Sequence, residues 1–286
     1  MNRLLETVSN ISQFGMDFSP DFIIGIGGGS PIDAAKAASV LIFHKSTDTD
    51  LLFDNRGDTH ITLFFVPTTA GSGSESTPSS ILTVHTRKTK LSIKRRVYCE
   101  KAFINFRYTI SMPYNITVST AVDVLTHLVD EYMSAKSNIF VDKLVKIGLL
   151  GFSEILPMIQ NEEFNECFRE KIMILSSIAG IIIANTRTTL THTMSYPLTY
   201  GKKITHGFAC GLLAYEYLVF HKNKYKVDDI VSALGFANIV ELKNFLKNSC
   251  PNIVCSEKEI YEYSNIVFED KERLSMHPYE VSLIVL

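Results

Sequence analysis

Residues 22–44, FIIGIGGGSPIDAAKAASVLIFH, place an apolar run, a glycine-rich turn and a helical pattern in direct succession. The apolar run ends at glycine, as buried strands of parallel sheets commonly do. Pro31 suits the first turn of a helix, and Ser30 is predicted to cap that helix. A second apolar run, ITLFFV at residues 61–66, follows the helical stretch. The succession predicts a β-α-β unit with two buried parallel strands.

The sequence changes character beyond Pro113, where strand patterns give way to apolar residues at helical spacing. We therefore expect an α/β part with a parallel, Rossmann-like sheet at residues 1–112 and an all-α part at residues 113–286. A further helix is expected at residues 3–14, ahead of the first strand. Ligand sites commonly lie in clefts between such parts. The helices predicted in the second part are residues 120–134, 140–155, 168–185, 207–220 and 239–247.

Composition excludes several classes of partner. The chain has 286 residues, with 28 Lys and Arg against 30 Asp and Glu, a net charge of −2 that favours neither nucleic acid nor an anionic membrane surface. The most apolar stretch, residues 172–186, is too short to cross a bilayer. Five scattered cysteines and a start without a signal-peptide pattern indicate a cytoplasmic protein.

Two glycine-rich loops follow predicted strands. The GGGS at residues 27–30 precedes a helix, where backbone N–H groups and the helix dipole can hold a phosphate. It is neither a G-x-G-x-x-G fingerprint nor a Walker loop, and a ligand-free turn is the alternative. The second loop, PTTAGSGSE at residues 67–75, is rich in hydroxyls, and a solvated loop is its alternative. Both loops open on the same sheet edge, which predicts a nucleotide site.

Asp123 and His127 are four residues apart in a predicted helix, so they project from one face one turn apart. His192 and His206 flank a later segment. One carboxylate and three imidazoles form a suitable donor set for a divalent transition metal, with positions left for substrate.

Each of these four residues alone has an ordinary explanation as a core histidine, a surface histidine or a helix charge. Asp130 and Glu131, close by in the same helix, are expected to be solvated. The remaining histidines fit no comparable pattern; they are His44, His60, His85, His221 and His277.

The ordered motifs GGGSPIDAAK, PTTAGSGSE, DVLTH and H-x₁₃-HG, spread over residues 21–208, resemble the iron-containing (group III) alcohol dehydrogenase family. The resemblance implies the architecture that this family shares with dehydroquinate synthase-like proteins, a dinucleotide-binding part followed by a helical metal-binding part. It also implies Fe2+ or Zn2+ in the cleft, reversible NAD(P)-linked oxidation of a small-molecule alcohol, and a homodimer.

The family's metal ligands and cofactor residues can be assigned position by position in this sequence. The resemblance implies that the metal ligands are Asp123, His127, His192 and His206. It implies a cofactor site at Gly28, Gly29, Ser30, Asp33, Thr68, Thr69, Ser72 and Lys90. His206 and Tyr196 are the expected catalytic residues.

Tyr196 is a departure from the family pattern H-A-M-A-H-P-L-G, whose second histidine is thought to help with proton transfer. A phenol can hold a hydrogen bond but is a poor free base at neutral pH. The SYPLT pattern at residues 195–199 is similar to family branches that act on phosphonoacetaldehyde-type substrates. Lys202 and Lys203 would suit such an anionic substrate, and solvated surface lysines are the alternative.

The chain is also shorter at both ends than the family pattern, so we expect an incomplete nucleotide-binding sheet with exposed apolar edges that favour self-association. Three functions stay open. The first is a metal-dependent NAD(P)-linked alcohol dehydrogenase and aldehyde reductase. The others are a catalytically silent relative that binds metal or nucleotide, and a glycerol-dehydrogenase-like enzyme. The PTTAGSGSE loop and the spacing of Asp123 and His127 favour the first.

Overall fold

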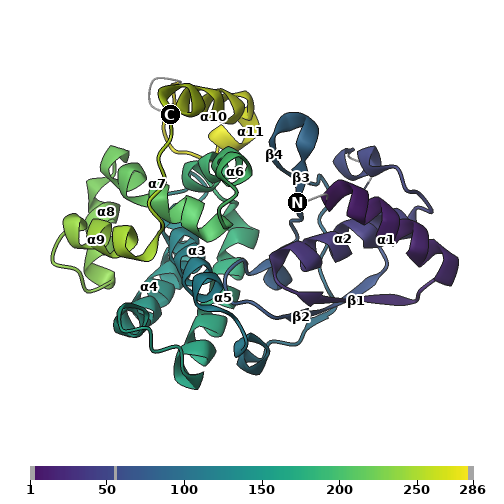
Figure 1. Cartoon of the computed structure of the whole chain (residues 1–286), viewed down its shortest axis with the longest axis horizontal. Coiled ribbons are helices and arrows are strands. Elements are labelled where there is room, and N and C mark those ends of the chain that lie inside the picture. The colour runs from purple at the N-terminus through teal and green to yellow at the C-terminus, as the bar shows by residue number, and fades with distance from the viewer. Residues whose placement is uncertain (1–3, 55–56, 283–286) are drawn as a thin grey trace.

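The structure, a computed structural model, describes residues 4–54 and 57–282 as two parts that lie side by side (Figure 1). All described strands lie in the N-terminal part, which ends its last strand at Ala102, and the helical part begins with a helix at Tyr114. The predicted fold class, an α/β part followed by an all-α part, is confirmed. Arg3, the first residue of the predicted N-terminal helix, lies outside the described residues.

The N-terminal part is built on a parallel sheet of order β1-β2-β5 and a separate antiparallel hairpin, β3-β4. β1 and β2 pair in parallel from Phe22 opposite Thr62 to Gly27 opposite Pro67, and α2 connects them, which confirms the predicted β-α-β unit. The helices and strands of this part are α1 (Leu4–Phe18), β1 (Phe22–Gly27), α2 (Gly29–Phe43), β2 (Thr62–Pro67), β3 (Ile81–Val84), β4 (Thr89–Ser92) and β5 (Lys101–Ala102).

β1 has one covered face and one open face. Gly25 points toward Ala35 of α2, so its neighbours along the strand point the other way. Phe22, Ile24 and Ile26 are accordingly 52%, 51% and 62% exposed. The prediction of two fully buried strands is therefore wrong for β1, because α1 and α2 cover only one side of the sheet (Figure 1).

The start of α2 also differs from the prediction. The helix begins at Gly29 with Gly28 in the capping position, and no side chain caps it. Ser30 lies inside the first turn, so the predicted Ser30 cap is wrong. An N-terminus without a side-chain cap keeps its backbone N–H groups available to a ligand.

The helical part is organised around α3, in which every residue from 121 to 132 is buried. The five predicted helices are present, with ends shifted by a few residues. Among the described helices, none is both long and apolar enough to cross a membrane. The helices are α3 (Tyr114–Tyr132), α4 (Ile139–Gln160), α5 (Glu166–Thr186), α6 (Leu190–Lys202), α7 (His206–Phe220), α8 (Lys224–Ala233), α9 (Ile239–Ser249), α10 (Glu257–Glu269) and α11 (Lys271–Leu274).

Candidate functional site

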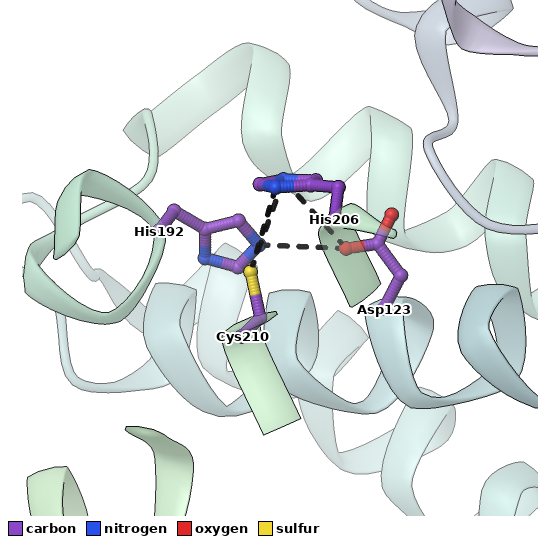
Figure 2. Close-up of side chains that lie close together, drawn as sticks. All are labelled: Asp123, His192, His206 and Cys210. Carbon is purple, nitrogen blue, oxygen red and sulfur yellow. Dashed lines mark hydrogen bonds and ion pairs between the residues drawn. The ribbon is translucent and has the colours of Figure 1, made fainter. Parts of the chain in front are cut away.

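Three buried or half-buried donor groups from three helices converge in the helical part (Figure 2). The carboxylate Oδ1 of Asp123, on α3, lies 4.0 Å from Nε2 of His192 on α6 and 3.8 Å from Nε2 of His206 at the start of α7. Oδ1 of Asp123 and Nε2 of His192 are buried, and neither has a hydrogen-bond partner among the described residues. Burial raises the pKa of Asp123 to about 6, and the charges of His192 and Lys90 limit the rise.

Cys210 is the fourth member of this cluster, and the sequence analysis overlooked it. Its Sγ lies 3.9 Å from Nδ1 and 3.8 Å from Nε2 of His206, one helical turn earlier on α7. One donor atom from each of Asp123, His192, His206 and Cys210 lies within 4.8 Å of the others. The spacing of four residues between His206 and Cys210 was the available sequence signal.

His127 lies beside this cluster. Its ring centroid is 4.2 Å from that of His192, and its Nδ1 is 3.9 Å from Oδ1 of Asp123. Nδ1 lies 3.0 Å from the backbone carbonyl oxygen of Asp123, which can only accept, so Nδ1 is the donor and Nε2 carries the lone pair. Burial lowers the pKa of His127 well below its usual value, which keeps the ring neutral.

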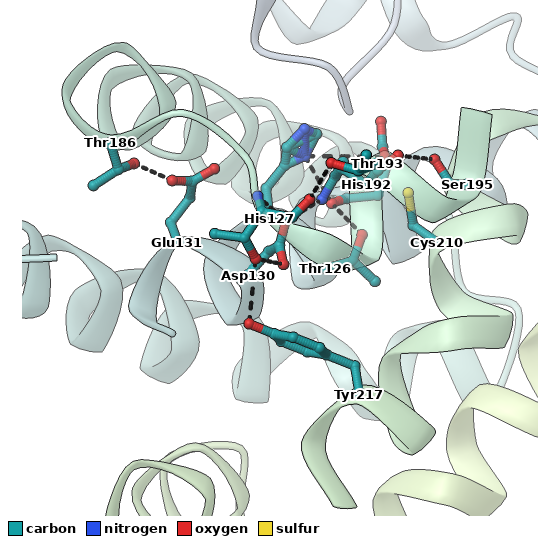
Figure 3. Close-up of polar contacts among 12 residues, drawn as sticks. Thr126, His127, Asp130, Glu131, Thr186, His192, Thr193, Ser195, Cys210 and Tyr217 are labelled. Carbon is teal, nitrogen blue, oxygen red and sulfur yellow. Dashed lines mark hydrogen bonds and ion pairs between the residues drawn. The ribbon is translucent and has the colours of Figure 1, made fainter. Parts of the chain in front are cut away.

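The orientation of His192 is set by Asp130 (Figure 3). Nδ1 of His192 donates to Oδ2 of Asp130 at 2.8 Å, and the same carboxylate accepts from the backbone N–H of Thr189 at 2.7 Å and from the Thr189 hydroxyl. Nε2 of His192 is thereby directed toward the cluster. A carboxylate behind a histidine is typical of metal-ligating imidazoles.

Asp130 and Glu131 are both 0% exposed, so the prediction that they are solvated is wrong. Although burial opposes it, the hydrogen bonds from His192 and Thr189 lower the pKa of Asp130. Glu131 accepts a hydrogen bond from the hydroxyl of Thr186, and burial, with the charge of Asp130, raises its pKa to about 8. Glu131 is consequently protonated at neutral pH, whereas Asp130 is charged.

His206 is held by Ser195. The Ser195 hydroxyl donates to the carbonyl oxygen of His192 at 2.7 Å and lies 3.1 Å from Nδ1 of His206. Because the single hydroxyl hydrogen is used by the carbonyl, the Ser195 oxygen accepts from Nδ1 of His206. Nε2 of His206 is then an acceptor, as in His127. Burial, followed by the charge of Lys90, lowers the pKa of His206 well below its usual value.

The cluster opens into a cavity of about 1540 Å³ between the two parts, lined by Asp123, His127, His192 and His206. From the N-terminal part, the cavity is lined by six of the eight predicted cofactor residues, namely Gly29, Ser30, Asp33, Thr69, Ser72 and Lys90. Gly28 and Thr68 are not part of this lining. Burial lowers the pKa of Lys90, and the nearby carboxylates of Asp123 and Asp33 oppose the shift. Predicted metal and cofactor residues therefore face one cavity.

The two glycine-rich loops touch each other. A Cβ atom at Gly28 would lie 2.8 Å from Oγ1 of Thr69, and one at Gly29 would lie 3.0 Å from Oγ of Ser72, so a larger residue at either position would push against a side chain of the second loop. The backbone N–H of Thr68 donates to the carbonyl of Gly27 at 2.9 Å.

Asp33 and the fully buried Lys36, both on α2, form hydrogen bonds to the second loop and to the segment that follows it. Asp33 accepts from the Ser74 hydroxyl at 2.7 Å and from the backbone N–H of Ile81 at 3.1 Å. Lys36 Nζ donates to the carbonyls of Ser74 and Ser79, both at 2.7 Å. Burial raises the pKa of Asp33 and lowers that of Lys36 to about 8. The carboxylate of Asp33 thus supports the loops as well as lining the cavity.

Tyr196 stands beside His206, with its ring stacked on the imidazole at a centroid distance of 5.5 Å and an angle of 22°. Its hydroxyl accepts from Nη1 of Arg273 at 3.0 Å. Arg273, which the sequence analysis did not single out, comes from α11. Of the two lysines suggested for an anionic substrate, Lys202 pairs with Glu259 at 2.6 Å and Lys203 is exposed, and neither lines the cavity.

Comparison with known proteins agrees with this architecture. The family model described as "Iron-containing alcohol dehydrogenase" matches residues 1–105, and the model for the C-terminal part of the same family matches residues 117–248. An iron-containing alcohol dehydrogenase from Thermotoga maritima superposes with a TM-score of 0.89 at 32% identity, over 98% of this chain and 77% of that chain. The sulfoacetaldehyde reductase of Bifidobacterium kashiwanohense, solved with NAD+, gives 0.85 at 25% identity, over 98% and 78%.

Two relatives show how much of a known protein this chain matches. The 4-hydroxybutyrate dehydrogenase of Clostridium kluyveri is 28% identical over 96% of this chain and 79% of its own length. The long-chain-alcohol dehydrogenase 1 of Geobacillus thermodenitrificans is 29% identical over 81% of this chain, but that match spans only 60% of the relative. The ordered motifs, the two-part fold and these matches agree, and the chain belongs to the iron-containing alcohol dehydrogenase family.

Proposed function

We propose that the protein is a metal-dependent, NAD(P)-linked alcohol dehydrogenase that also acts as an aldehyde reductase on a small-molecule substrate. The observation that carries this proposal is a pair of buried atoms, Oδ1 of Asp123 and Nε2 of His192, that have no hydrogen-bond partner in the described part of the chain and lie close to His206. Buried polar atoms are nearly always hydrogen-bonded, so two such atoms left without a hydrogen bond from any described residue indicate a ligand at this point. A divalent cation fits this donor set, which contains one carboxylate and imidazole nitrogens.

The proposed ligands of Fe2+ or Zn2+ are Asp123, His127, His192 and His206. When bound, such a metal acts as a Lewis acid on the substrate oxygen. The neutral rings of His127 and His206 offer Nε2 lone pairs, and Asp130 behind His192 adds a second negative charge that offsets the charge of a cation.

The proposed site for NAD(H) or NADP(H) is formed by Gly28, Gly29, Ser30, Asp33, Thr68, Thr69, Ser72 and Lys90. Support comes from the start of α2, which has no side-chain cap, and from the contact between the two loops. When bound, the nicotinamide accepts or donates the hydride, and the protein sets the distance and angle. The neighbour from B. kashiwanohense, solved with NAD+, is consistent with this role.

Tyr196 and His206 are the proposed catalytic residues. Because Arg273 donates to the Tyr196 oxygen, the Tyr196 hydrogen is left to be donated toward the cavity. We assign Tyr196 to holding the proton that is exchanged with the substrate oxygen. A Tyr196→Phe variant is then expected to retain metal and turn over more slowly.

Three broader assignments accompany the site. We propose that residues 1–112 form the dinucleotide-binding domain and residues 113–286 the metal-binding domain. We propose a homodimer, supported by the open apolar face of β1. We propose a cytoplasmic location, supported by the fact that all five cysteines are free.

The decisive experiment measures metal content in anaerobically purified protein together with NADH and NADPH binding by cofactor fluorescence. About one iron or zinc per chain, with saturable binding and aldehyde reduction, is expected for a dehydrogenase. Metal or nucleotide binding without turnover of any aldehyde would instead identify a catalytically silent relative. Loss of metal in His206→Ala is expected, and full activity with metal in that variant would contradict the site.

Beside Asp123, His192 and His206, either His127 or Cys210 could be the fourth metal ligand. Replacing the metal with Co2+ distinguishes these two assignments. We expect Cys210→Ser to retain Co2+ and His127→Ala to lose it. A cobalt–thiolate bond has an intense near-ultraviolet charge-transfer absorption. This absorption in the wild type, lost in Cys210→Ser, would assign the position to Cys210.

A further inference from the structure

Lys36 is a buried cation behind the second glycine-rich loop. Its side chain is 0% exposed and leaves α2 one turn after Asp33, on the face that packs against this loop. Nζ lies 2.7 Å from the carbonyl oxygens of Ser74 and Ser79. It also lies 3.0 Å from Oγ of Ser74 and 3.4 Å from Oγ1 of Thr77. Four oxygen atoms from the loop and the segment after it therefore surround one ammonium group.

The donors of an ammonium group match this set of acceptors. Lysine has three N–H donors and no acceptor, so it can donate to both carbonyls and to one of the hydroxyls. Oγ of Ser74 donates its own hydrogen to Oδ1 of Asp33 at 2.7 Å, which leaves its lone pairs for Lys36. The charge is offset by Asp33 at 3.9 Å, and the ring of Phe65 lies 5.7 Å from Nζ. Lys36 is thus a built-in cation of the loop, partly neutralised by Asp33.

The location of the acceptors indicates what this charge is for. A charged group is costly to bury, whereas a methionine would fill a similar space without that cost. The three residues whose oxygens surround Nζ, namely Ser74, Thr77 and Ser79, all line the cavity between the two parts. The ammonium group of Lys36 therefore shapes a wall of the cavity, although Lys36 does not line it.

Ser74 connects Lys36 to the proposed cofactor site. The backbone N–H of Ser74 donates to Oγ of Ser72 at 3.3 Å. A Cβ atom at Gly29 would lie 3.0 Å from the same oxygen, so the Ser72 hydroxyl lies against the first residue of α2. The start of this helix is the part suited to the phosphates of a dinucleotide. The position of Ser74 therefore determines where the Ser72 hydroxyl lies relative to these phosphates.

We propose that Lys36 is a positioning residue for the cofactor: its ammonium group holds Ser74 and Ser79 so that the hydroxyls of the second loop face the start of α2. This proposal rests on the proposed function and adds a buried residue to its cofactor site. Because Lys36 acts through Ser74 and Ser72, it should affect the binding of NAD(P)H and leave the binding of the metal unchanged.

The charge of Lys36 makes this positioning depend on pH. Burial lowers the pKa of Lys36 to about 8, and the charges of Asp33, Glu75 and Cys99 oppose the shift. Below this pH the group is an ammonium with three N–H donors. Above it, the amine has two donors and a lone pair that faces oxygen atoms. The affinity for NAD(P)H is therefore expected to be full below about pH 8 and to fall as the pH rises through that value.

Lys36→Met tests the proposal, because it removes the ammonium group and keeps the length of the side chain. At pH 7 we expect this variant to bind NADH and NADPH about 10-fold more weakly than the wild type, with unchanged metal content. Lys45→Met is the matched control, because Lys45 is an exposed lysine just beyond the end of α2. The control should bind as the wild type does. Equal affinity in Lys36→Met and the wild type would overturn the proposal.

A pH series distinguishes Lys36 from Lys90, which lines the cavity and whose pKa is also lowered by burial. Cofactor affinity between pH 7 and about pH 9.5 should fall in the wild type and stay flatter in Lys36→Met. An equally steep fall in that variant would assign the effect to Lys90 and overturn the proposal. NMR of lysine labelled with 13C at Cε follows the titration directly and needs no variant. A wild-type chain whose lysines all titrate near the ordinary value would also overturn it.

Amide hydrogen exchange of residues 72–79 separates this proposal from the proposed function, because it needs no cofactor. At pH 7 we expect exchange in this segment to be about 10-fold faster in Lys36→Met than in the wild type and in Lys45→Met. Faster exchange, with no binding of NADH or NADPH by the wild type, would leave the role of Lys36 in the loop intact and contradict the dehydrogenase assignment. Unchanged exchange would overturn the role of Lys36 even if the protein reduces aldehydes. Melting temperatures check that each variant is folded.

Discussion

Asp130 decides the chemistry that His192 can offer to a metal. The carboxylate is fully buried, accepts from Nδ1 of His192 and is itself held by two hydrogen bonds from Thr189. The imidazole therefore has a fixed orientation and a more basic Nε2. Asp130 carries no motif in the sequence beyond being an acidic neighbour of Glu131, and it becomes part of the site because it is buried beside His192.

We expect Asp130→Asn to weaken metal binding by about 10-fold to 100-fold, because the amide keeps the hydrogen-bond geometry but removes the negative charge behind His192. Competition with a chromophoric chelator measures the affinity. Glu154→Gln, which removes an exposed carboxylate paired with Lys171, is the control and should bind as the wild type does. Equal affinity in Asp130→Asn and the wild type would exclude Asp130 from the metal site.

Glu131 makes the stability of the protein depend on pH. Its folded-state pKa is about 8, above the usual 4.5, because burial disfavours the charged form. Below about pH 4.5 the group is protonated in both states and has no effect. Between the two values only the unfolded state ionises, so the free energy of unfolding falls as the pH rises, by up to about 1.4 kcal/mol per pH unit.

Glu131→Gln should remove this slope, since the amide is neutral at every pH and can still accept from Thr186. Urea unfolding of chelator-treated protein between about pH 5 and pH 8 measures the difference. The wild-type curve is expected to decline toward the alkaline side while the variant stays flatter. Parallel curves would mean that Glu131 ionises normally in the folded chain.

At the scale of elements, Gly207 sets how closely α7 approaches α3. A Cβ atom at this position would lie 1.9 Å from the backbone oxygen of Ser119 and 2.9 Å from Cβ of Asp123. Only glycine lets the first turn of α7 pass this close, and that contact brings His206 within 3.8 Å of the Asp123 carboxylate. The glycine after the last histidine is therefore a packing requirement of the metal cluster.

Gly207→Ala is expected to lower the free energy of unfolding by about 1–3 kcal/mol and to reduce metal content, because the collision is with backbone atoms that cannot rotate away. Gly151→Ala is the matched control. That glycine lies in α4, and an added Cβ meets only Cδ2 of Leu175 at 2.9 Å, the far end of a flexible side chain. A Gly207→Ala protein with wild-type melting and full metal content would refute this role.

The elements that the sequence predicts are those with regular apolar spacing. α6 has no such spacing: it contains Pro197 and the polar run THTMSY, and it is held by buried contacts on both sides of His192. Helix propensity does not predict a helix whose stability comes mainly from tertiary packing. The start of α2 at Gly28 likewise depends on a contact between distant segments, since Gly28 lies against the Thr69 side chain of another loop.

For the whole molecule, the sequence predicts the two-part fold, residue type and spacing suggest the proposed metal ligands, and the family resemblance implies the proposed cofactor residues. It does not predict Arg273, which lies 77 residues beyond its partner Tyr196 and carries no motif of its own. Nor does it predict that Asp130 and Glu131 are buried, because α3 is covered on all sides and its polar residues then follow no amphipathic pattern. Long-range packing decides both.

β1 is an edge strand of the parallel sheet, and one of its faces is apolar and exposed. Phe22, Ile24 and Ile26 alternate along an edge strand and are each more than half exposed. Exposed apolar faces and unpaired strand edges are sites of association between chains. The proposed homodimer would bury this face.

We expect the protein to sediment as a dimer or larger species, and Ile24→Lys to shift it toward the monomer, because a charged side chain on this face must be desolvated on association. Sedimentation velocity at several protein concentrations measures the distribution. Ile139→Lys provides the control, since Ile139 is 78% exposed at the start of α4 in the helical part. If the wild type is monomeric at every concentration, or if both variants dissociate equally, the β1 face does not mediate association. A shift confined to Ile24→Lys, with metal content unchanged, would place the interface on the sheet and separate it from the metal cluster.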